Sequence, residues 1–128
     1  MTYDAYESYA QVDLGAQTAQ ASSVQLVLIL MNGLQDELAR ARAHIEGSRF
    51  EAKARSLDKC VGMLNGLSSS LDTDAGGEVV AQVAQVYDYC ARRLHEAGVR
   101  LDVGMVDEVG RLLRTLQEGW EGMQAHHG

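Results

Sequence analysis

Apolar residues recur every three or four positions along most of the chain, which is the spacing that places them on one face of an α-helix. The pattern covers four segments, at about residues 23–45, 49–71, 77–97 and 106–123. Polar and glycine-containing stretches such as Glu46-Gly47-Ser48 separate these segments. Because four helices joined by short loops favour antiparallel neighbours, the sequence predicts an all-α fold, an antiparallel up-down four-helix bundle.

The boundaries of the expected bundle follow from capping residues and from the loss of the apolar pattern. Residues 1–21 have scattered apolar positions without a sustained stripe, so they are expected to be a flexible or short-helical N-terminal segment before a bundle of residues 22–125. Ser22 is the expected N-cap of the first helix, and Gly98 is the expected C′ residue that ends the third. The last residues, 125–128, are expected to fray.

Each helix is expected to turn one row of apolar residues toward a single core, which a chain of 128 residues is long enough to form. Tyr87 falls on an inward row, whereas Tyr89 points away from it. The expected inward rows contain Val27, Leu30, Met31, Leu34, Leu38, Ala41 and Ile45; Phe50, Ala54, Leu57, Val61, Leu64 and Leu71; Val80, Val83, Tyr87, Cys90, Ala91, Leu94 and Ala97; and Val106, Val109, Leu113, Leu116, Trp120 and Met123.

Charge and composition exclude several classes of protein. With a formal net charge of −7, the chain does not show the excess of basic residues that nucleic-acid binding requires. No apolar run is long enough for membrane insertion, and the acidic, polar start of the chain lacks the features of a signal peptide, so a cytoplasmic location is expected. Cys60 and Cys90 are expected to be buried free thiols.

Residues that would carry chemistry are sparse. No histidine follows a glutamate at the spacing used by di-iron bundles, and no Cys-x-x-Cys pair is present, so we expect no metal, no cofactor and no enzymatic activity. One alternative is a histidine phosphotransfer relay through His44 or His95, although an acid follows each where a phosphoryl group prefers a cation. Another is a homo-oligomeric helical adaptor.

Several short motifs occur in an order and spacing that resemble the FliS family of flagellin export chaperones, over about residues 22–123. Two departures, at Met31 and Asn32, replace the family's Tyr and Asp and are expected to alter affinity or client choice wherever those side chains touch the client. The motifs are Leu30-Met31-Asn32-Gly33, Ser70-Leu71-Asp72, Gly76-Gly77-Glu78, Tyr87-Asp88-Tyr89 followed by Arg93-Leu94 and Glu96-Ala97, and Trp120.

The resemblance implies a cytoplasmic chaperone that binds the C-terminal helical segment of flagellin and prevents its premature polymerisation. It also implies assistance in delivering flagellin to the flagellar type III export apparatus, and other flagellar export or regulatory proteins as further partners. An N-terminal tyrosine, Tyr9 or its neighbours Tyr3 and Tyr6, would cover the client groove when it is empty. The protein is expected to be a monomer or weak dimer.

The sequence predicts a client-binding groove lined by apolar residues. All but one of these residues lie outside the inward rows. A groove that receives an amphipathic segment is a recurring mode of recognition, and surplus apolar rows are the surface it needs. The alternative is that these residues are bundle core, because four-helix packing can itself use three positions per heptad. The expected groove residues are Leu26, Ile29, Cys60, Met63, Leu67, Val79, Val83, Val86 and Tyr89.

Overall fold

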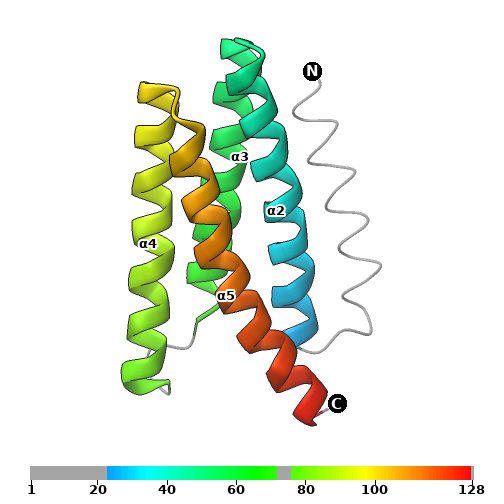
Figure 1. Ribbon diagram of the computed structural model, residues 1–128. Coiled ribbons are helices and arrows are strands. Elements are labelled where there is room, and N and C mark those ends of the chain that lie inside the picture. Colours follow the sequence, from blue (N-terminus) through cyan, green and yellow to red (C-terminus); the bar gives the residue numbers. More distant parts are fainter. Residues whose placement is uncertain (1–22, 72–75, 128) are drawn as a thin grey trace.

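The computed structural model describes residues 23–71 and 76–127, and these residues contain four α-helices and no strand (Figure 1). The helices are α2 (Ser23–Glu46), α3 (Phe50–Ser69), α4 (Gly77–Arg100) and α5 (Val103–His127). The all-α prediction is therefore confirmed. The expected N-terminal segment, including Tyr9 and the Ser22 cap, lies outside the described residues.

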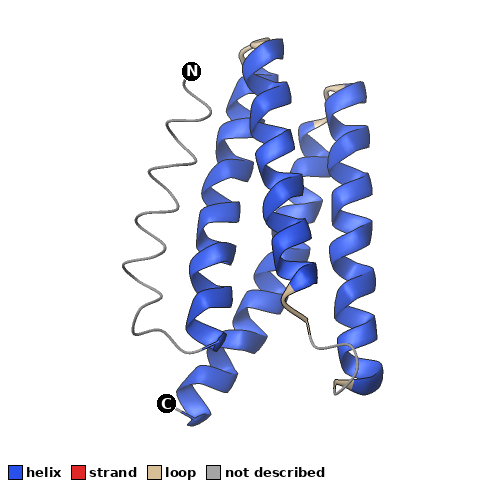
Figure 2. Cartoon of the chain, turned by 180° about the vertical axis from the view of Figure 1, so that it is seen from behind, coloured by secondary structure: helices blue, strands red, loops and turns tan. Residues whose placement is uncertain are grey.

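The four helices form a closed ring of neighbours. Helix α2 packs against α3, α3 against α4, and α4 against α5, which returns to α2. Successive helices run in opposite directions, as the view from behind also shows (Figure 2). This is the up-down bundle that short connections favour.

A continuous apolar core runs through the bundle and contains most of the residues expected to face inward. Three residues predicted to lie in the core are instead exposed: Phe50, Ala54 and Met123. Phe50 is the first residue of α3, and Met123 is near the end of α5. Ala54 lies at the edge of the buried face of α3. The buried core residues are Met31, Leu34, Leu38, Ala41, Ile45, Leu57, Cys60, Leu64, Leu67, Tyr87, Cys90, Leu94, Ala97, Met105, Val106, Val109 and Leu113.

The prediction that Gly98 ends the third helix is wrong, because α4 continues to Arg100 and the left-handed residue is Leu101, with φ 55°. Gly98 is buried inside the helix, where a β-carbon would lie 2.7 Å from Leu57 Cδ1. Its carbonyl oxygen accepts a hydrogen bond of 3.0 Å from Lys53 Nζ. The glycine therefore permits a close approach of α3 and α4 rather than a turn.

The connection between α4 and α5 is only Leu101 and Asp102, shorter than the sequence indicated. Asp102 Oδ1 accepts hydrogen bonds from the backbone N–H groups of Gly104, at 2.8 Å, and Met105, at 3.3 Å. These bonds satisfy donors that the first turn of a helix leaves unpaired. Helix α5 runs on to His127 and so includes three of the four residues expected to fray, while Gly128 lies outside the described residues.

Replacing Gly98 by leucine is expected to destabilise the bundle by about 1–3 kcal/mol, because the new side chain overpacks the contact with Leu57. The matched control is Gly62→Leu on α3, where no atom lies within 4 Å of an added β-carbon. That change is expected to stabilise the helix by roughly 0.5–1 kcal/mol through helix propensity. Urea denaturation measures both; equal effects would contradict a close approach at Gly98.

Candidate functional site

The apolar face of α4 is covered at one end of the bundle and uncovered at the other. Val79 precedes Ala97 by eighteen residues, or five helical turns, so both side chains lie on the same side of α4. Ala97 is 0% exposed and Val79 is 69% exposed. The neighbour that covers Ala97 is therefore missing at the start of α4.

Helix α5 shows the same change along its length. Met105 is 7% exposed, and Met123, five turns further on the same side, is 45% exposed. Figure 1 shows the reason: α4 and α5 are joined at one end, and α5 then slants away from α4. We call this region the open end and define it by Val79, Val83 and Val86 of α4 and Leu112, Leu116 and Met123 of α5, which are partly buried or exposed.

Three polar contacts join α5 to α2. Arg42 Nε donates to Asp107 Oδ1 at 2.9 Å, and Gln35 Nε2 donates to the Gly110 carbonyl oxygen at 3.0 Å. Further along, Gln117 Nε2 donates to Asn32 Oδ1 at 2.6 Å. These three bonds hold α5 against α2 from Asp107 to Gln117.

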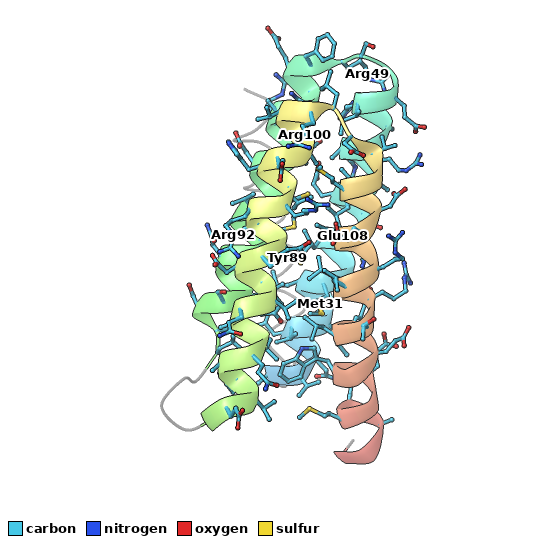
Figure 3. The ribbon with its side chains drawn as sticks, turned by 60° about the vertical axis from the view of Figure 1, so that its left-hand side comes forward. Met31, Arg49, Tyr89, Arg92, Arg100 and Glu108 are labelled. Carbon is cyan, nitrogen blue, oxygen red and sulfur yellow. The ribbon has the colours of Figure 1, made fainter. Side chains whose placement is uncertain are left out.

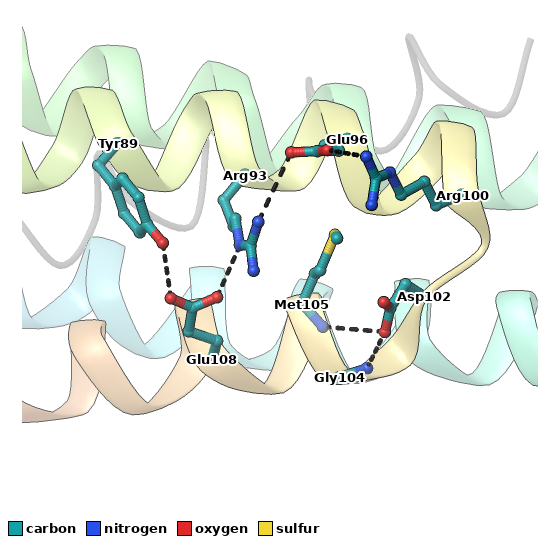
Figure 4. Close-up of polar contacts among 8 residues, drawn as sticks. All are labelled: Tyr89, Arg93, Glu96, Arg100, Asp102, Gly104, Met105 and Glu108. Atoms are coloured by element: carbon teal, nitrogen blue, oxygen red, sulfur yellow. Dashed lines mark hydrogen bonds and ion pairs between the residues drawn. The ribbon is translucent and has the colours of Figure 1, made fainter.

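Glu108 of α5 is bonded to two side chains of α4 (Figure 4). The Tyr89 hydroxyl donates to Glu108 Oε2 at 2.7 Å, and Arg93 Nε donates to Glu108 Oε1 at 2.7 Å. Tyr89 and Glu108 point toward one another from the two helices (Figure 3). These hydrogen bonds hold the pKa of Glu108 below its ordinary value and raise that of Tyr89.

One aromatic pair spans α4 and α5 beyond this cluster. Tyr87 is buried, and its hydroxyl oxygen is hydrogen-bonded by the side chain of Trp120, the donor being the indole N–H. Burial raises the pKa of Tyr87, and the bond from Trp120 opposes that shift. Trp120 is only partly buried, so it lies against the core at the margin of the open end rather than inside the core as predicted.

The structure separates the nine predicted groove residues into three groups. Cys60 and Leu67 are core residues with no surface for a partner. Leu26, Ile29 and Met63 are partly buried on α2 and α3, the helices opposite the open end. Val79, Val83 and Val86 lie together at the open end, and Tyr89 borders it with its hydroxyl bonded to Glu108.

Helix α5 contributes to this surface, which the predicted groove residues did not include. Leu112 lies beside Leu113, and this doubled apolar position was the available signal of a second row. Met123 was assigned to an inward row, where its periodicity places it. The inward row of α5 is apolar along its whole length. Its last turns are exposed only because α5 slants away from α4.

The two cysteines are buried, and one of the two histidines considered for phosphotransfer is hydrogen-bonded. Burial raises the pKa of the Cys60 thiol and raises that of Cys90 to about 11, so both are protonated at neutral pH. His44 Nδ1 accepts a hydrogen bond of 3.0 Å from Arg49 Nε, while His95 is exposed on α4. Within residues 23–71 and 76–127 no three His, Cys, Asp or Glu side chains form a group that could hold a metal ion.

Residues 5–127 match the family model of the flagellar protein FliS. The chain belongs to the FliS family. In the described part of the chain, no FliS helix combines the length and hydropathy needed to cross a bilayer.

Curated FliS proteins from distant bacteria resemble the chain over nearly all of its length. The flagellar secretion chaperone FliS of Salmonella typhimurium is 36% identical over 94% of this chain and 90% of its own. FliSB of Pseudomonas aeruginosa, also named a flagellar secretion chaperone, is 34% identical over 93% and 94%. The Bacillus subtilis protein of the same name is 28% identical over 91% and 83%.

The Tyr87–Trp120 hydrogen bond is expected to couple the two residues energetically. Trp120→Phe leaves a buried hydroxyl without this donor and should lower the free energy of unfolding by about 1–3 kcal/mol. Tyr87→Phe should cost less, and the double variant should cost less than the sum of the two single changes. Urea denaturation of the four proteins measures the cycle, and additive effects would contradict the bond.

The cluster around Glu108 gives stability a defined dependence on pH. Because the folded pKa of Glu108 is lowered, its stabilisation is complete above its unfolded pKa and is lost as the pH falls through the folded value. Wild-type protein should therefore lose more stability than Glu108→Gln between about pH 6 and about pH 3. Urea denaturation of both proteins across this range measures the difference. If the stability of both falls equally with pH, Glu108 is not held by these contacts.

Tyr89 gives the opposite dependence at high pH. Because its folded pKa is raised, the stability that its bond to Glu108 contributes is lost as the pH rises through the folded pKa of Tyr89.

Proposed function

We propose that this protein is a cytoplasmic flagellar export chaperone that binds the C-terminal helical segment of flagellin at the open end. Binding there prevents premature polymerisation of flagellin and assists its delivery to the flagellar type III export apparatus. The observation that carries the proposal is the uncovered apolar face shared by α4 and α5, in a chain that belongs to the FliS family. The activity is binding, so it requires no catalytic residue.

The open end suits an amphipathic helix. Its apolar side chains lie on two diverging helices, so a third helix laid between them contacts both. Val79 and Met123 would pass from water to a packed interface, which is the main source of favourable free energy in such a contact. Tyr89 borders the surface with an exposed ring, while its bond to Glu108 fixes the orientation of that ring.

Titration calorimetry with a peptide that covers the C-terminal helical region of a flagellin from the same cell tests the proposal. We expect saturable one-to-one binding with a negative change in heat capacity, the signature of buried apolar surface. Val79→Asp should weaken binding at least about tenfold, because a charge would be buried in the interface. The fold should tolerate it, because Val79 is exposed and an acid in the first turn of a helix is favourable.

Ala81→Asp is the matched control, since Ala81 is exposed two residues further along α4 and adds the same charge. It should leave affinity unchanged. Equal weakening by both variants would place the peptide elsewhere on the protein. No binding by folded wild-type protein would overturn the proposal, and a stable dimer in sedimentation would then favour the homo-oligomeric adaptor.

A further inference from the structure

The basic residues of the chain are confined to one half of the bundle. All eleven Lys and Arg lie in residues 40–59 and 92–114. Because successive helices run in opposite directions, both ranges belong to the half that contains the α2–α3 and α4–α5 connections. The exposed part of the open end lies in the other half. Val79 and Met123 are thirteen and nine residues away from the nearest Lys or Arg of their own helices.

Acidic side chains are present in that half without a basic partner. Glu78 on α4 and Glu118 and Glu121 on α5 are exposed, and no ion pair within the described residues includes any of them. Asp88, near the middle of α4, is instead paired with Arg92. The exposed apolar side chains of the open end therefore lie in a negative potential, which favours a partner of positive charge.

Glu78 and Glu118 border the open end from its two helices. Glu78 precedes Tyr89 by eleven residues, or three helical turns, so it lies on the side of α4 from which Tyr89 reaches α5. Besides the hydrogen bonds that lower it, the charge of Arg111 lowers the pKa of Glu108, so Arg111 lies near the edge of α5 that faces α4. Glu118 follows Arg111 by seven residues, or two turns, and lies on the same side.

The two carboxylates lie at different levels along the bundle. Trp120 of α5 is bonded to Tyr87 of α4, so Glu118, two residues before Trp120, lies near the level of Tyr87. Glu78 precedes Tyr87 by nine residues, a distance of about 13 Å along α4. Side chains nine residues apart on a helix point in opposite directions, because each residue turns the helix by about 100°. One helix laid between α4 and α5 therefore meets both carboxylates, one with each edge of its apolar face.

We propose that the helical segment bound at the open end carries two basic residues nine positions apart, one on each edge of its apolar face. This inference rests on the proposed function and adds the chemistry by which the site selects its client. Glu78 pairs with one cation and Glu118 with the other, while the apolar face covers Val79, Val83 and Met123. The two pairs fix the register of the segment, which apolar contact alone leaves free to slide.

Fluorescence anisotropy of three labelled synthetic helical peptides, each with leucines on one face, measures this selection by the full chain. The opposite-edge peptide has two lysines nine positions apart, the same-edge peptide has them seven positions apart, and the third peptide has glutamines instead. The same-edge peptide controls for net charge. The opposite-edge peptide should bind about threefold more tightly than the same-edge peptide and about tenfold more tightly than the glutamine peptide, because each exposed ion pair contributes modestly.

Glu78→Gln/Glu118→Gln should bind all three peptides with the affinity that the wild-type protein has for the glutamine peptide. The matched control is Glu51→Gln/Asp58→Asn, which removes the same charge from two exposed acids of α3 in the half that contains the basic residues. It should leave the order of affinities unchanged. Equal affinity of the wild-type protein for the opposite-edge and same-edge peptides would overturn the proposal, as would an order that survives Glu78→Gln/Glu118→Gln.

Competition with the flagellin peptide separates this inference from the proposed function. If the flagellin peptide binds but the three synthetic peptides bind equally or not at all, the charge selection is wrong and the proposed function stands. If the synthetic peptides show the expected order and the flagellin peptide neither binds nor displaces them, the charge selection stands and the client is another helical segment of this chemistry.

Discussion

The connection of α4 and α5 through only Leu101 and Asp102 is the constraint on which the rest of the bundle depends. Two residues cannot separate the helix ends by more than about 10 Å, and the Asp102 cap fixes where α5 begins. The helices must therefore touch at this end. Beyond it, polar bonds join α5 to α2 as far as Gln117, and to α4 through Glu108 and the Tyr87–Trp120 pair. Helix α5 nevertheless slants away from α4 after their connection (Figure 1).

The helices and most of the core were predictable because a period of 3.6 residues is a local property of the sequence. Burial at helix ends was not, because it depends on the direction of a neighbouring helix. Phe50 and Met123 have the same spacing as the core residues and are nevertheless exposed. Gly98 illustrates a second limit: a glycine near the end of a helical pattern serves equally well as a cap or as a site of close packing, and only the position of Leu57 decides between them.

The candidate site was predicted in part for the same reason. The valines of α4 were identified as surplus apolar residues, and they do lie at the open end. Cys60 and Leu67 carried the same signal and proved to be core, since α3 is enclosed by both of its neighbours. No local pattern links Asn32 to Gln117, which are 85 residues apart, yet their bond joins α5 to α2.

The two thiols of the core give the folded protein a property that its composition would not suggest. Cys60 on α3 and Cys90 on α4 are fully buried, and burial keeps both as the unreactive protonated form. Alkylating reagents can reach them only when the helices separate. The rate of alkylation at each cysteine therefore reports how often its part of the bundle opens. The native chain thus carries two internal probes of local unfolding, one on α3 and one on α4.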